Sequence, residues 1–386
     1  MIINHKQTNR RSVLLLSLFV SVFLSAKSQN QQSEDKISLL FIGDIMGHDE
    51  QIWSAENRET HTFNYDDVFR YIGPVIKEAD ISVANFEVTL AGPPYMGYPQ
   101  FSSPADLAVA CKNAGIDWLV TANNHAADRR NTGIISTINK LDSIGIPHTG
   151  TFLNSQCRDS LYPSMIQRNG TSIALLNYTF STNGIKVPEP VIVNMLDKEL
   201  ITKDVKKAKD KKADIIILFL HWGTEYDTIP SKSQTDLAEY FQSIGVDLVI
   251  GSHPHVLQKM VLNNNAGIKN DGVVIYSLGN FISNQRKPKT DGGSMVRIEL
   301  TRNWDKYAVT NAGYYLTWVY TPIEKYRKKF FILPCSEFEN RPDFFDKAEA
   351  YSLMKKFITD SRKLLNEQNI NIKEYIFNGS YWLLSN

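Results

Sequence analysis

Two short apolar runs, each leading into histidine, limit what this chain can fold into. Residues 215–220 are all apolar and lead into His221, and the run that includes residues 248–250 leads into His253 and His255. Six apolar residues in a row are too few for a helix and are typical of a strand covered on both faces. In parallel α/β sheets, the residues just beyond the carboxyl ends of the strands meet in one crevice. The two runs therefore predict imidazoles gathered at one edge of a sheet.

Three further predicted strands end in polar residues of the same kind. They cover about residues 37–42, 81–84 and 117–122, and each is followed by Asp, Asn, Glu or His. The candidate side chains at the five strand ends are Asp44, Asn85 and Glu87, Asn124 and His125, His221, and His253 and His255. Burying unpaired polar groups costs free energy, so folding alone does not account for five such groups on one edge. The set predicts a metal site or a polar catalytic site.

The mixture of ligand types indicates the class of metal. Carboxylate, carboxamide and imidazole groups without thiolate suit Zn, Mn, Fe or a similar divalent ion, and they do not make a calcium cage. We therefore expect one or two divalent metal ions as cofactors. Two ions about 3.5–4 Å apart would share a bridging carboxylate, and such pairs stabilise the attacking and leaving oxygens of phosphoester hydrolysis.

The order of the predicted elements indicates an α/β fold. Strands and helices alternate over residues 37–281, which places helices on both faces of a mainly parallel sheet. Apolar residues at helical spacing predict a helix over residues 66–79. Another helix begins at Ser231, where Gln234 three residues later completes a capping box.

The chain changes character beyond Gly292. Predicted strands follow one another there without long helices, and a single amphipathic helix runs from Asp346 to about Leu365. We interpret this part as an antiparallel continuation of the core. Residues 301–386 would then pack as C-terminal strands and a helix on the same domain as residues 37–300.

The first 28 residues have the layout of a signal peptide. A basic start precedes an apolar stretch at residues 13–26, and the small residues Ala26 and Ser28 lie before the predicted cleavage position. The stretch is shorter than the roughly 20 residues of a membrane span. A retained anchor is the alternative, and only then would the protein contact a membrane. We expect an exported protein that is periplasmic, secreted or on the cell surface, with residues 29–36 as a polar linker.

The charge balance gives no sign of a polyanionic partner. The chain has 42 Lys and Arg residues against 41 Asp and Glu residues, so its net charge does not indicate nucleic acid or an anionic membrane. Three cysteines are too few for a disulfide framework in an exported protein.

Six motifs occur in a characteristic order along the chain. They are Gly-Asp at 43–44, Asn-Phe-Glu at 85–87, Ala-Asn-Asn-His at 122–125, His-Trp-Gly-Thr-Glu-Tyr at 221–226, Gly-Ser-His-Pro-His at 251–255 and Ser-Leu-Gly-Asn-Phe at 277–281. This set resembles the CapA family of capsule-synthesis (poly-γ-glutamate) proteins, which have a calcineurin-like metallophosphatase fold. The resemblance covers residues 37–285. It implies a four-layer α/β/β/α sandwich like that of metallo-dependent phosphatases, with the site at the strand ends.

Carried over position by position, the resemblance implies a role for each residue. Asp44 would be the first-motif ligand, and Glu87 stands where the bridging carboxylate belongs. The remaining ligands would be Asn124, His221 and His253 on one ion and His255 on the other. His125, which follows a ligand directly, would be the general acid that protonates the leaving group. Asp44 and His125 are thus the predicted catalytic residues.

One motif departs from the pattern of ordinary metallophosphatases. They have Asp-x-His in the first motif, whereas this chain has Asp44, Ile45 and Met46. A thioether is a poor ligand for a hard divalent ion. One metal position would therefore be weak or empty, unless His48 replaces the missing imidazole.

The resemblance and the spacing suggest further contacts to substrate or ligands, namely Asn85, Arg129, Glu225 and Asn280. Arg129, next to Arg130, would contact an anionic substrate or only begin a helix. Glu225 would contact substrate, support a ligand or hold its own loop. Asn280 would cap a turn or take part in catalysis.

These features leave two functions open. The first is a phosphoesterase-like metal-dependent hydrolase that uses metal-activated water on an envelope polymer or its precursor. The second is a non-catalytic, metal-containing factor for export or anchoring of an anionic capsule polymer such as poly-γ-glutamate, working with other capsule-synthesis proteins. A pure binder needs no general acid, so His125 favours the first, while the departure at Met46 favours the second. Hydrolysis of a γ-amide bond would use the same metal chemistry.

Overall fold

The computed structural model of the chain describes residues 36–263, 272–304 and 306–385. The predicted signal peptide, residues 1–28, and residues 29–35 of the predicted linker lie outside the described residues, whereas Lys36, predicted as the last linker residue, is the first residue of a strand. Within these ranges, no helix has the length and apolar composition that crossing a membrane requires.

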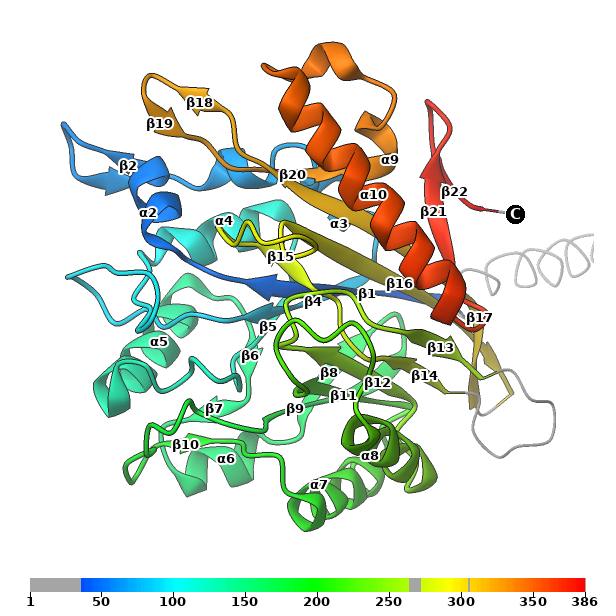
Figure 1. Cartoon of the computed structure of the whole chain (residues 1–386). Coiled ribbons are helices and arrows are strands. Elements are labelled where there is room, and N and C mark those ends of the chain that lie inside the picture. The colour runs from blue at the N-terminus through cyan, green and yellow to red at the C-terminus, as the bar shows by residue number, and fades with distance from the viewer. Residues whose placement is uncertain (1–35, 264–271, 305, 386) are drawn as a thin grey trace, which may run out of the picture.

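A large mixed sheet carries one half of the molecule (Figure 1). Its strand order is β22-β21-β17-β16-β1-β4-β5-β6, with β15 beside β1 and β20 beside β17. The bounds are β1 Lys36–Ile45, β4 Ile81–Phe86, β5 Trp118–Val120, β6 His148–Thr149, β15 Asn280–Ile282, β16 Gly292–Asn303, β17 Lys306–Tyr320, β20 Phe331–Pro334, β21 Lys373–Phe377 and β22 Trp382–Leu384. Strands β1, β4, β5 and β6 are parallel, so their carboxyl ends share one edge.

A second sheet has the order β13-β14-β12-β11-β9-β8. Its strands are β8 Ser164–Arg168, β9 Thr171–Thr179, β11 Ile215–His221, β12 Leu248–Ser252, β13 Met260–Leu262 and β14 Val273–Ile275. The four central strands are parallel, and β8 and β13 flank them in antiparallel orientation.

The alternation of side chains along the strands packs the two sheets face to face. Leu39 and Phe41 of β1 share one apolar core with Ile217 and Phe219 of β11. Leu40, between them in sequence, packs on the opposite face of its sheet. Both faces of both sheets are therefore buried, which explains the uninterrupted apolar runs in the sequence.

Helices complete two outer layers. Helices α4 (Asp106–Ala114) and α5 (Arg130–Ile144) contribute to the core on the outer face of the first sheet. Helices α7 (Lys198–Asp210) and α8 (Lys232–Ser243) cover the outer face of the second. The fold is the predicted four-layer α/β/β/α sandwich.

The C-terminal part extends the first sheet. Strand β16 pairs antiparallel with β1, and β17 pairs antiparallel with β16. Helix α10 (Ala348–Gln368) adds Met354 and Phe357 to the core between the sheets, beside Leu316 of β17. The smaller elements are α2 Asp49–Ala55, β2 Glu56–Asn57, β3 Thr62–Phe63, β7 Thr151–Phe152, α6 Ser155–Leu161, β10 Ile192–Val193, β18 Ile323–Glu324, β19 Arg327–Lys328, α9 Cys335–Phe338 and the 3₁₀ turn η2 Pro342–Phe344.

The two helix predictions had different outcomes. The predicted helix over residues 66–79 is wrong: this segment forms a 3₁₀ turn, η1 (Asp66–Phe69), and a single helical turn, α3 (Gly73–Ile76). Pro74 lacks a backbone N–H and clashes with the preceding turn, so one continuous helix cannot form. The capping box of α8 is confirmed, because the Ser231 hydroxyl accepts from the Gln234 backbone and the Gln234 side chain accepts from the Ser231 backbone.

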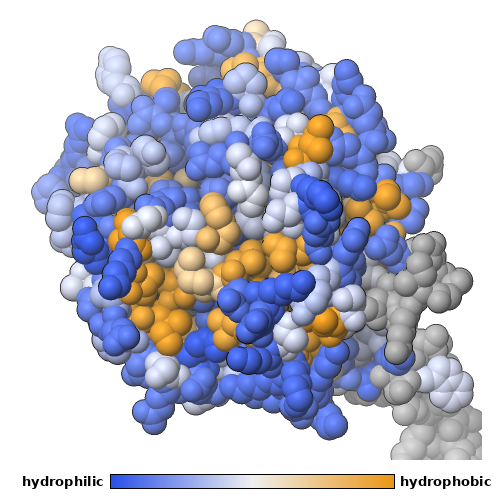
Figure 2. All heavy atoms as spheres, turned by 60° about the horizontal axis from the view of Figure 1, so that its bottom comes forward, coloured by the Kyte–Doolittle hydropathy of each residue, from blue (hydrophilic) through white to orange (hydrophobic). Residues whose placement is uncertain are grey.

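The helical layer on the second sheet has a mainly hydrophilic surface. Figure 2 shows the side on which α6, α7 and α8 lie in Figure 1, and one stretch of apolar side chains crosses it. In α7 the apolar face is buried through Ile201, Val205 and Ala208, while Lys203 and Lys206 are exposed. The lysine-rich sequence of this helix is thus a solvated face.

Candidate metal centre

The strand register brings the predicted residues of the two sheets to one place. Asp44 of β1 is level with Asn85 of β4 on one side and Asn280 of β15 on the other. In the second sheet His221 of β11 is level with Ser252 of β12. The carboxyl ends of both sheets face each other here, as the sequence predicts.

A close backbone approach fixes the position of Asp44. Its backbone N–H donates to the carbonyl of Gly279 at 3.0 Å. A Cβ atom at Gly43 would lie only 2.1 Å from that same carbonyl oxygen. Only glycine fits at residue 43, and the Gly-Asp motif therefore allows β15 to lie directly against the end of β1.

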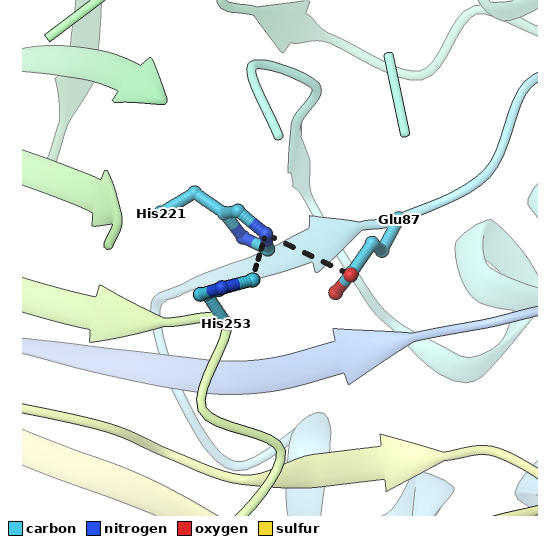
Figure 3. Close-up of side chains that lie close together, drawn as sticks. All are labelled: Glu87, His221 and His253. Carbon is cyan, nitrogen blue, oxygen red and sulfur yellow. Dashed lines mark hydrogen bonds and ion pairs between the residues drawn. The ribbon is translucent and has the colours of Figure 1, made fainter. Parts of the chain in front are cut away.

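A first group of ligand atoms surrounds the Nε2 atom of His221 (Figure 3). This atom is 3.1 Å from Nδ1 of His253 and 3.7 Å from Oε1 of Glu87. The Oδ1 atom of Asn124 lies 2.8 Å from it. These four side chains are at most 4% exposed. They include all the ligands predicted for one ion.

A second group contains Asp44, Glu87 and His255. The Nδ1 atom of His255 is 3.2 Å from Oδ2 of Asp44, and its Nε2 atom is 3.9 Å from Oε1 of Glu87. Asn280 places its Oδ1 atom 3.0 Å from Nδ1 of His255 and donates its own amide to the carbonyl of Thr290 at 2.8 Å. Asn280 thus orients a candidate ligand, His255, and Glu87 is common to both groups.

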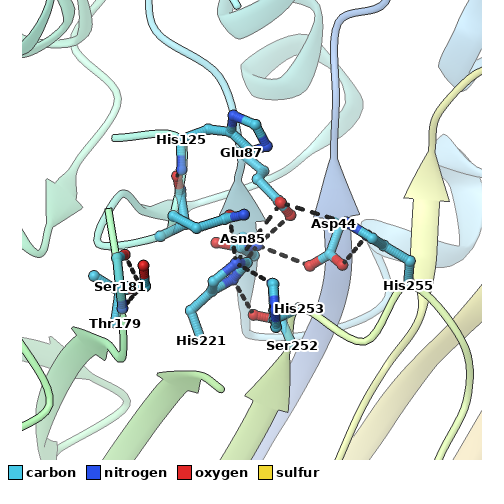
Figure 4. A network of polar contacts seen from close by, with 12 residues as sticks. Asp44, Asn85, Glu87, His125, Thr179, Ser181, His221, Ser252, His253 and His255 are labelled. Atoms are coloured by element: carbon cyan, nitrogen blue, oxygen red, sulfur yellow. Dashed lines mark hydrogen bonds and ion pairs between the residues drawn. The ribbon is translucent and has the colours of Figure 1, made fainter. Parts of the chain in front are cut away.

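Asn85 connects the two groups (Figure 4). Its amide nitrogen donates to Asp44 Oδ1 at 2.8 Å and to Glu87 Oε2 at 3.2 Å, and it lies 3.3 Å from Nδ1 of His221. A single amide therefore holds two carboxylates that would otherwise repel each other.

The electrostatics of the cluster favour a bound cation. Burial, together with the charge of Asp44, raises the pKa of Glu87 well above its ordinary value. Burial and the neighbouring imidazoles lower the pKa of His221 far below its ordinary value and that of His253 to about 3. Neutral imidazoles beside crowded carboxylates are ligands that a divalent ion would stabilise. Two buried oxygens, Glu87 Oε1 and Asn85 Oδ1, have no hydrogen-bond partner among the described residues. The donor set fits a divalent metal.

The backbone around the second sheet's histidines is strained. His253 has φ 99° and His255 has φ 59°, conformations that non-glycine residues adopt at a cost of about 1–3 kcal/mol each. Such strain persists where the surrounding structure fixes the backbone for a function. It allows two histidines, separated only by Pro254, to reach the same cluster.

His125 has a partner that the sequence reasoning missed. Its Nδ1 atom lies 2.8 Å from Oδ2 of Asp128, which also accepts the backbone N–H of Phe101 at 2.7 Å. The Phe101 ring packs edge-on against the imidazole at 4.6 Å. The sequence signal for this pair is an aspartate three residues after a histidine. The orientation of Asp128 also depends on its hydrogen bond with the backbone of Phe101, which is distant in sequence.

The remaining candidates lie around this centre. His48 contacts Gln51 and the backbone N–H of Asn284 through Nδ1, and Met46 is buried in the apolar core of the first helical layer. Arg129 donates to the backbone carbonyls of Gln100 and Pro94. Glu225 is exposed and has a carboxylate oxygen within 4.8 Å of ligand atoms of His253 and His255.

Asn177, a second residue that the sequence patterns did not indicate, connects the two sheets. Asn177 of β9 accepts the backbone N–H of Ala122 at 2.7 Å and donates to the carbonyl of Phe219 at 3.1 Å. Each of these backbone groups lies two residues before a candidate ligand, namely Asn124 and His221. Asn177 therefore sets the relative position of ligands that come from different sheets.

Replacing Asn177 by alanine is expected to lower divalent-metal affinity about 10-fold or more. It should also destabilise the fold by about 1–3 kcal/mol, because buried backbone groups lose their partners. Titration with Mn²⁺ well below the unfolding temperature measures the affinity, with Asn311→Ala on β17 as the control. A loss of stability with unchanged metal affinity would show that Asn177 supports only the fold.

The sandwich and the carboxylate–imidazole cluster at its strand ends together define an α/β protein with a candidate metal centre between its two sheets. Residues 38–285 match the bacterial capsule synthesis protein PGA_cap family. The match covers more than half of the chain, which therefore belongs to this family, and the resemblance found in the sequence motifs is confirmed.

Two CapA proteins are among the relatives of this chain. Capsule biosynthesis protein CapA of Bacillus anthracis is 29% identical over 320 residues, 77% of this chain and 74% of the relative. PGA biosynthesis protein CapA of Bacillus subtilis (strain 168) is 28% identical over 317 residues, 77% of this chain and 79% of the relative.

The solved structures align at low identity. NAD nucleotidase (NadN) of Haemophilus influenzae has a TM-score of 0.41 and 13% identity over 85% of this chain and 60% of its own. Calcineurin-like phosphoesterase YfkN from Bacillus subtilis has a TM-score of 0.44 and 13% identity over 85% of this chain and 98% of its own. The 5′-nucleotidase from Candida albicans SC5314 has a TM-score of 0.40 and 11% identity over 86% of this chain and 58% of its own. The chain thus spans less than two thirds of either nucleotidase, and the fold assignment rests on the sheets and layers described above.

Proposed function

We propose that this chain is an exported metal-dependent hydrolase that cleaves a phosphoester bond in a cell-envelope polymer or its precursor. Membership of a capsule synthesis family supports the envelope context. The observation that carries the proposal is the His125–Asp128 pair beside a buried cluster of metal-type ligands. A site that only binds has no use for an oriented proton donor.

The ligand groups suggest how the ions would be held. Glu87, His221, His253 and Asn124 would hold one ion, and Asp44, Glu87 and His255 would hold the other. Divalent ions in such a site polarise a phosphoester and make a water molecule more acidic. Asn85 would keep the two carboxylates in place while they are ionised.

His125 would supply the proton that the reaction needs. Hydrolysis adds a hydroxyl to phosphorus and a proton to the leaving oxygen, so the P–O bond breaks without charge build-up on the alcohol. Because Nδ1 of His125 faces Asp128, the Nε2 atom is the one available to donate. The Asp128 carboxylate fixes the ring orientation and stabilises the protonated imidazole.

A non-catalytic role in exporting or anchoring an anionic capsule polymer is the second candidate. The observation that favours it is the burial of Met46 in an apolar core at the position where ordinary metallophosphatases have a histidine. The second ion would then lack a ligand, and the site would bind carboxylates without turnover.

Metal analysis combined with an activity assay separates these functions. We expect the chain from residue 29 to retain about one or two divalent ions, and to hydrolyse p-nitrophenyl phosphate or its diester. Chelation should abolish the activity and Mn²⁺ should restore it. Bound metal without turnover of these esters would favour the assembly role, and a metal-free protein would contradict both candidates.

A further inference from the structure

Three aromatic side chains at the candidate metal centre are exposed to solvent. Tyr98, Phe180 and Tyr226 are 69%, 44% and 40% exposed, and we call them the aromatic rim. Each ring contacts the imidazole of one histidine of the centre. The ring centroids are 6.4 Å apart for Tyr98–His125, 4.7 Å for Phe180–His253 and 6.2 Å for Tyr226–His255. Solvent therefore meets aromatic rings beside three of the buried histidines.

The rim belongs to three separate segments that the site itself holds. The backbone N–H of Phe180 donates to the carbonyl of His221 at 3.0 Å, and that of Tyr226 donates to the carbonyl of Pro254 at 2.8 Å. Tyr226 also has a left-handed backbone, with φ 70°. The guanidinium of Arg129 fixes the segment that carries Tyr98. The backbone segments that carry the three rings are thus held in place by hydrogen bonds.

Polar groups lie next to these rings. The ammonium group of Lys287 is 4.4 Å from the centroid of the Tyr226 ring. Glu225 is exposed beside the second sheet's histidines, and Asn183 accepts a hydrogen bond from Asn124 at 3.2 Å. C–H groups pack favourably on the negative face of an aromatic ring. Aromatic rings beside an ammonium, a carboxylate and an amide therefore suit a ligand that presents C–H groups on some sides and hydroxyl groups on others.

We propose that the aromatic rim is a subsite for the sugar ring of a glycosyl phosphoester, an inference that rests on the proposed phosphoesterase function. Three rings that approach from different segments suit a puckered ring whose C–H bonds point in several directions. A linear polyanion would instead need a cluster of basic side chains. Here the Lys287 ammonium group lies over the ring of Tyr226, whose side chain also interacts with the Glu225 carboxylate, and the guanidinium of Arg129 is bound to backbone carbonyls.

The test compares substrates with and without a ring in the metal-loaded protein. The probes are a hexose 1-phosphate, a nucleoside 5′-monophosphate and glycerol 3-phosphate. The variants are Tyr98→Ala, Phe180→Ala and Tyr226→Ala, with Tyr226→Phe as the conservative replacement. Tyr381→Ala serves as the control, because Tyr381 is 60% exposed in the β21–β22 turn.

Each rim-to-alanine variant should lower kcat/KM for the hexose phosphate about 2- to 10-fold, mainly through KM. The loss on glycerol phosphate should be smaller, the Tyr381→Ala control should change neither rate, and Tyr226→Phe should retain most of the sugar preference. Equal losses on all three substrates would show that the rim acts through the histidines. A loss confined to the nucleotide would indicate a base subsite. Either result, or no change at all, would overturn the proposal.

If the protein hydrolyses none of the probes, the proposed function is refuted, but the sugar subsite is still open to a binding test. Calorimetric titration of the same three phosphates into the metal-loaded protein then decides. A preference for hexose phosphate over glycerol phosphate that the rim variants abolish would support the subsite. Equal affinity for the two ligands would overturn it.

Discussion

Replacing Glu87 by glutamine is expected to remove most of the bound divalent metal and to lower metal affinity by at least about 100-fold. Changes to residues that merely support a ligand typically cost 10–100-fold, and Glu87 belongs to both groups of ligand atoms. The substitution keeps the shape of the side chain but removes its charge. Elemental analysis of the purified variant and titration with Mn²⁺ measure the loss. Glu59→Gln, at an exposed position, is the matched control.

The same variant should be more stable than the wild type once metal is removed. Burial raises the pKa of Glu87 in the folded protein above its ordinary value of 4.5. An acid with a raised folded-state pKa contributes its full stability below its unfolded pKa and loses it as the pH rises through the folded value. Metal-free wild type should therefore lose stability relative to the glutamine variant as the pH rises from 4.5.

Urea unfolding in the presence of a chelator, at pH 5 and pH 8, tests this account. With metal present the order should reverse, because an ion that binds only the folded state stabilises the wild type. Unchanged metal content with lost activity would show that Glu87 is not a ligand. A metal-free variant less stable than the wild type at pH 8 would contradict the electrostatic explanation.

The sequence predicted those parts of the site that depend on strand ends. Residues 215–220 are apolar because both faces of β11 are covered, and the strand direction then places His221 at the edge without any knowledge of tertiary contacts. The same reasoning applies to Asp44 and Glu87. Residues that act across the fold left no such signal. Asn177 is a polar residue that follows four apolar residues in β9, and its partners are Ala122, in the segment after β5, and Phe219 of β11.

The wrong helix prediction and the missed role of Asp128 have similar physical causes. The apolar spacing over residues 66–79 is real, since Val68, Ile72, Val75 and Ile76 are all buried, but the local effect of Pro74 outweighs the pattern. The missed role of Asp128 depends on the backbone of Phe101, whose segment is fixed by Arg129 and not by local sequence. Patterns along one element are thus readable from sequence, whereas contacts between elements require the structure.

Replacing His125 by alanine is expected to lower kcat on alkyl phosphoesters by about 10²- to 10⁴-fold, the usual contribution of a general acid. The loss should be much smaller on p-nitrophenyl phosphate, because p-nitrophenolate leaves without needing a proton. Asp128→Asn should have the same dependence on the leaving group with a smaller loss, since the ring keeps its packing against Phe101 but loses a charged partner. Steady-state kinetics on both substrates, with saturating Mn²⁺, provide the measurement.

The dependence on the leaving group separates proton donation from a structural role. Damage to the metal centre would lower turnover of both esters equally and would change the metal content. A defect in protonation affects only the ester whose leaving oxygen must accept a proton. His61→Ala removes an exposed histidine and should change neither rate. Equal losses on the two esters with metal fully bound would mean that His125 stabilises the phosphoryl group, and the general-acid assignment would then have to be abandoned.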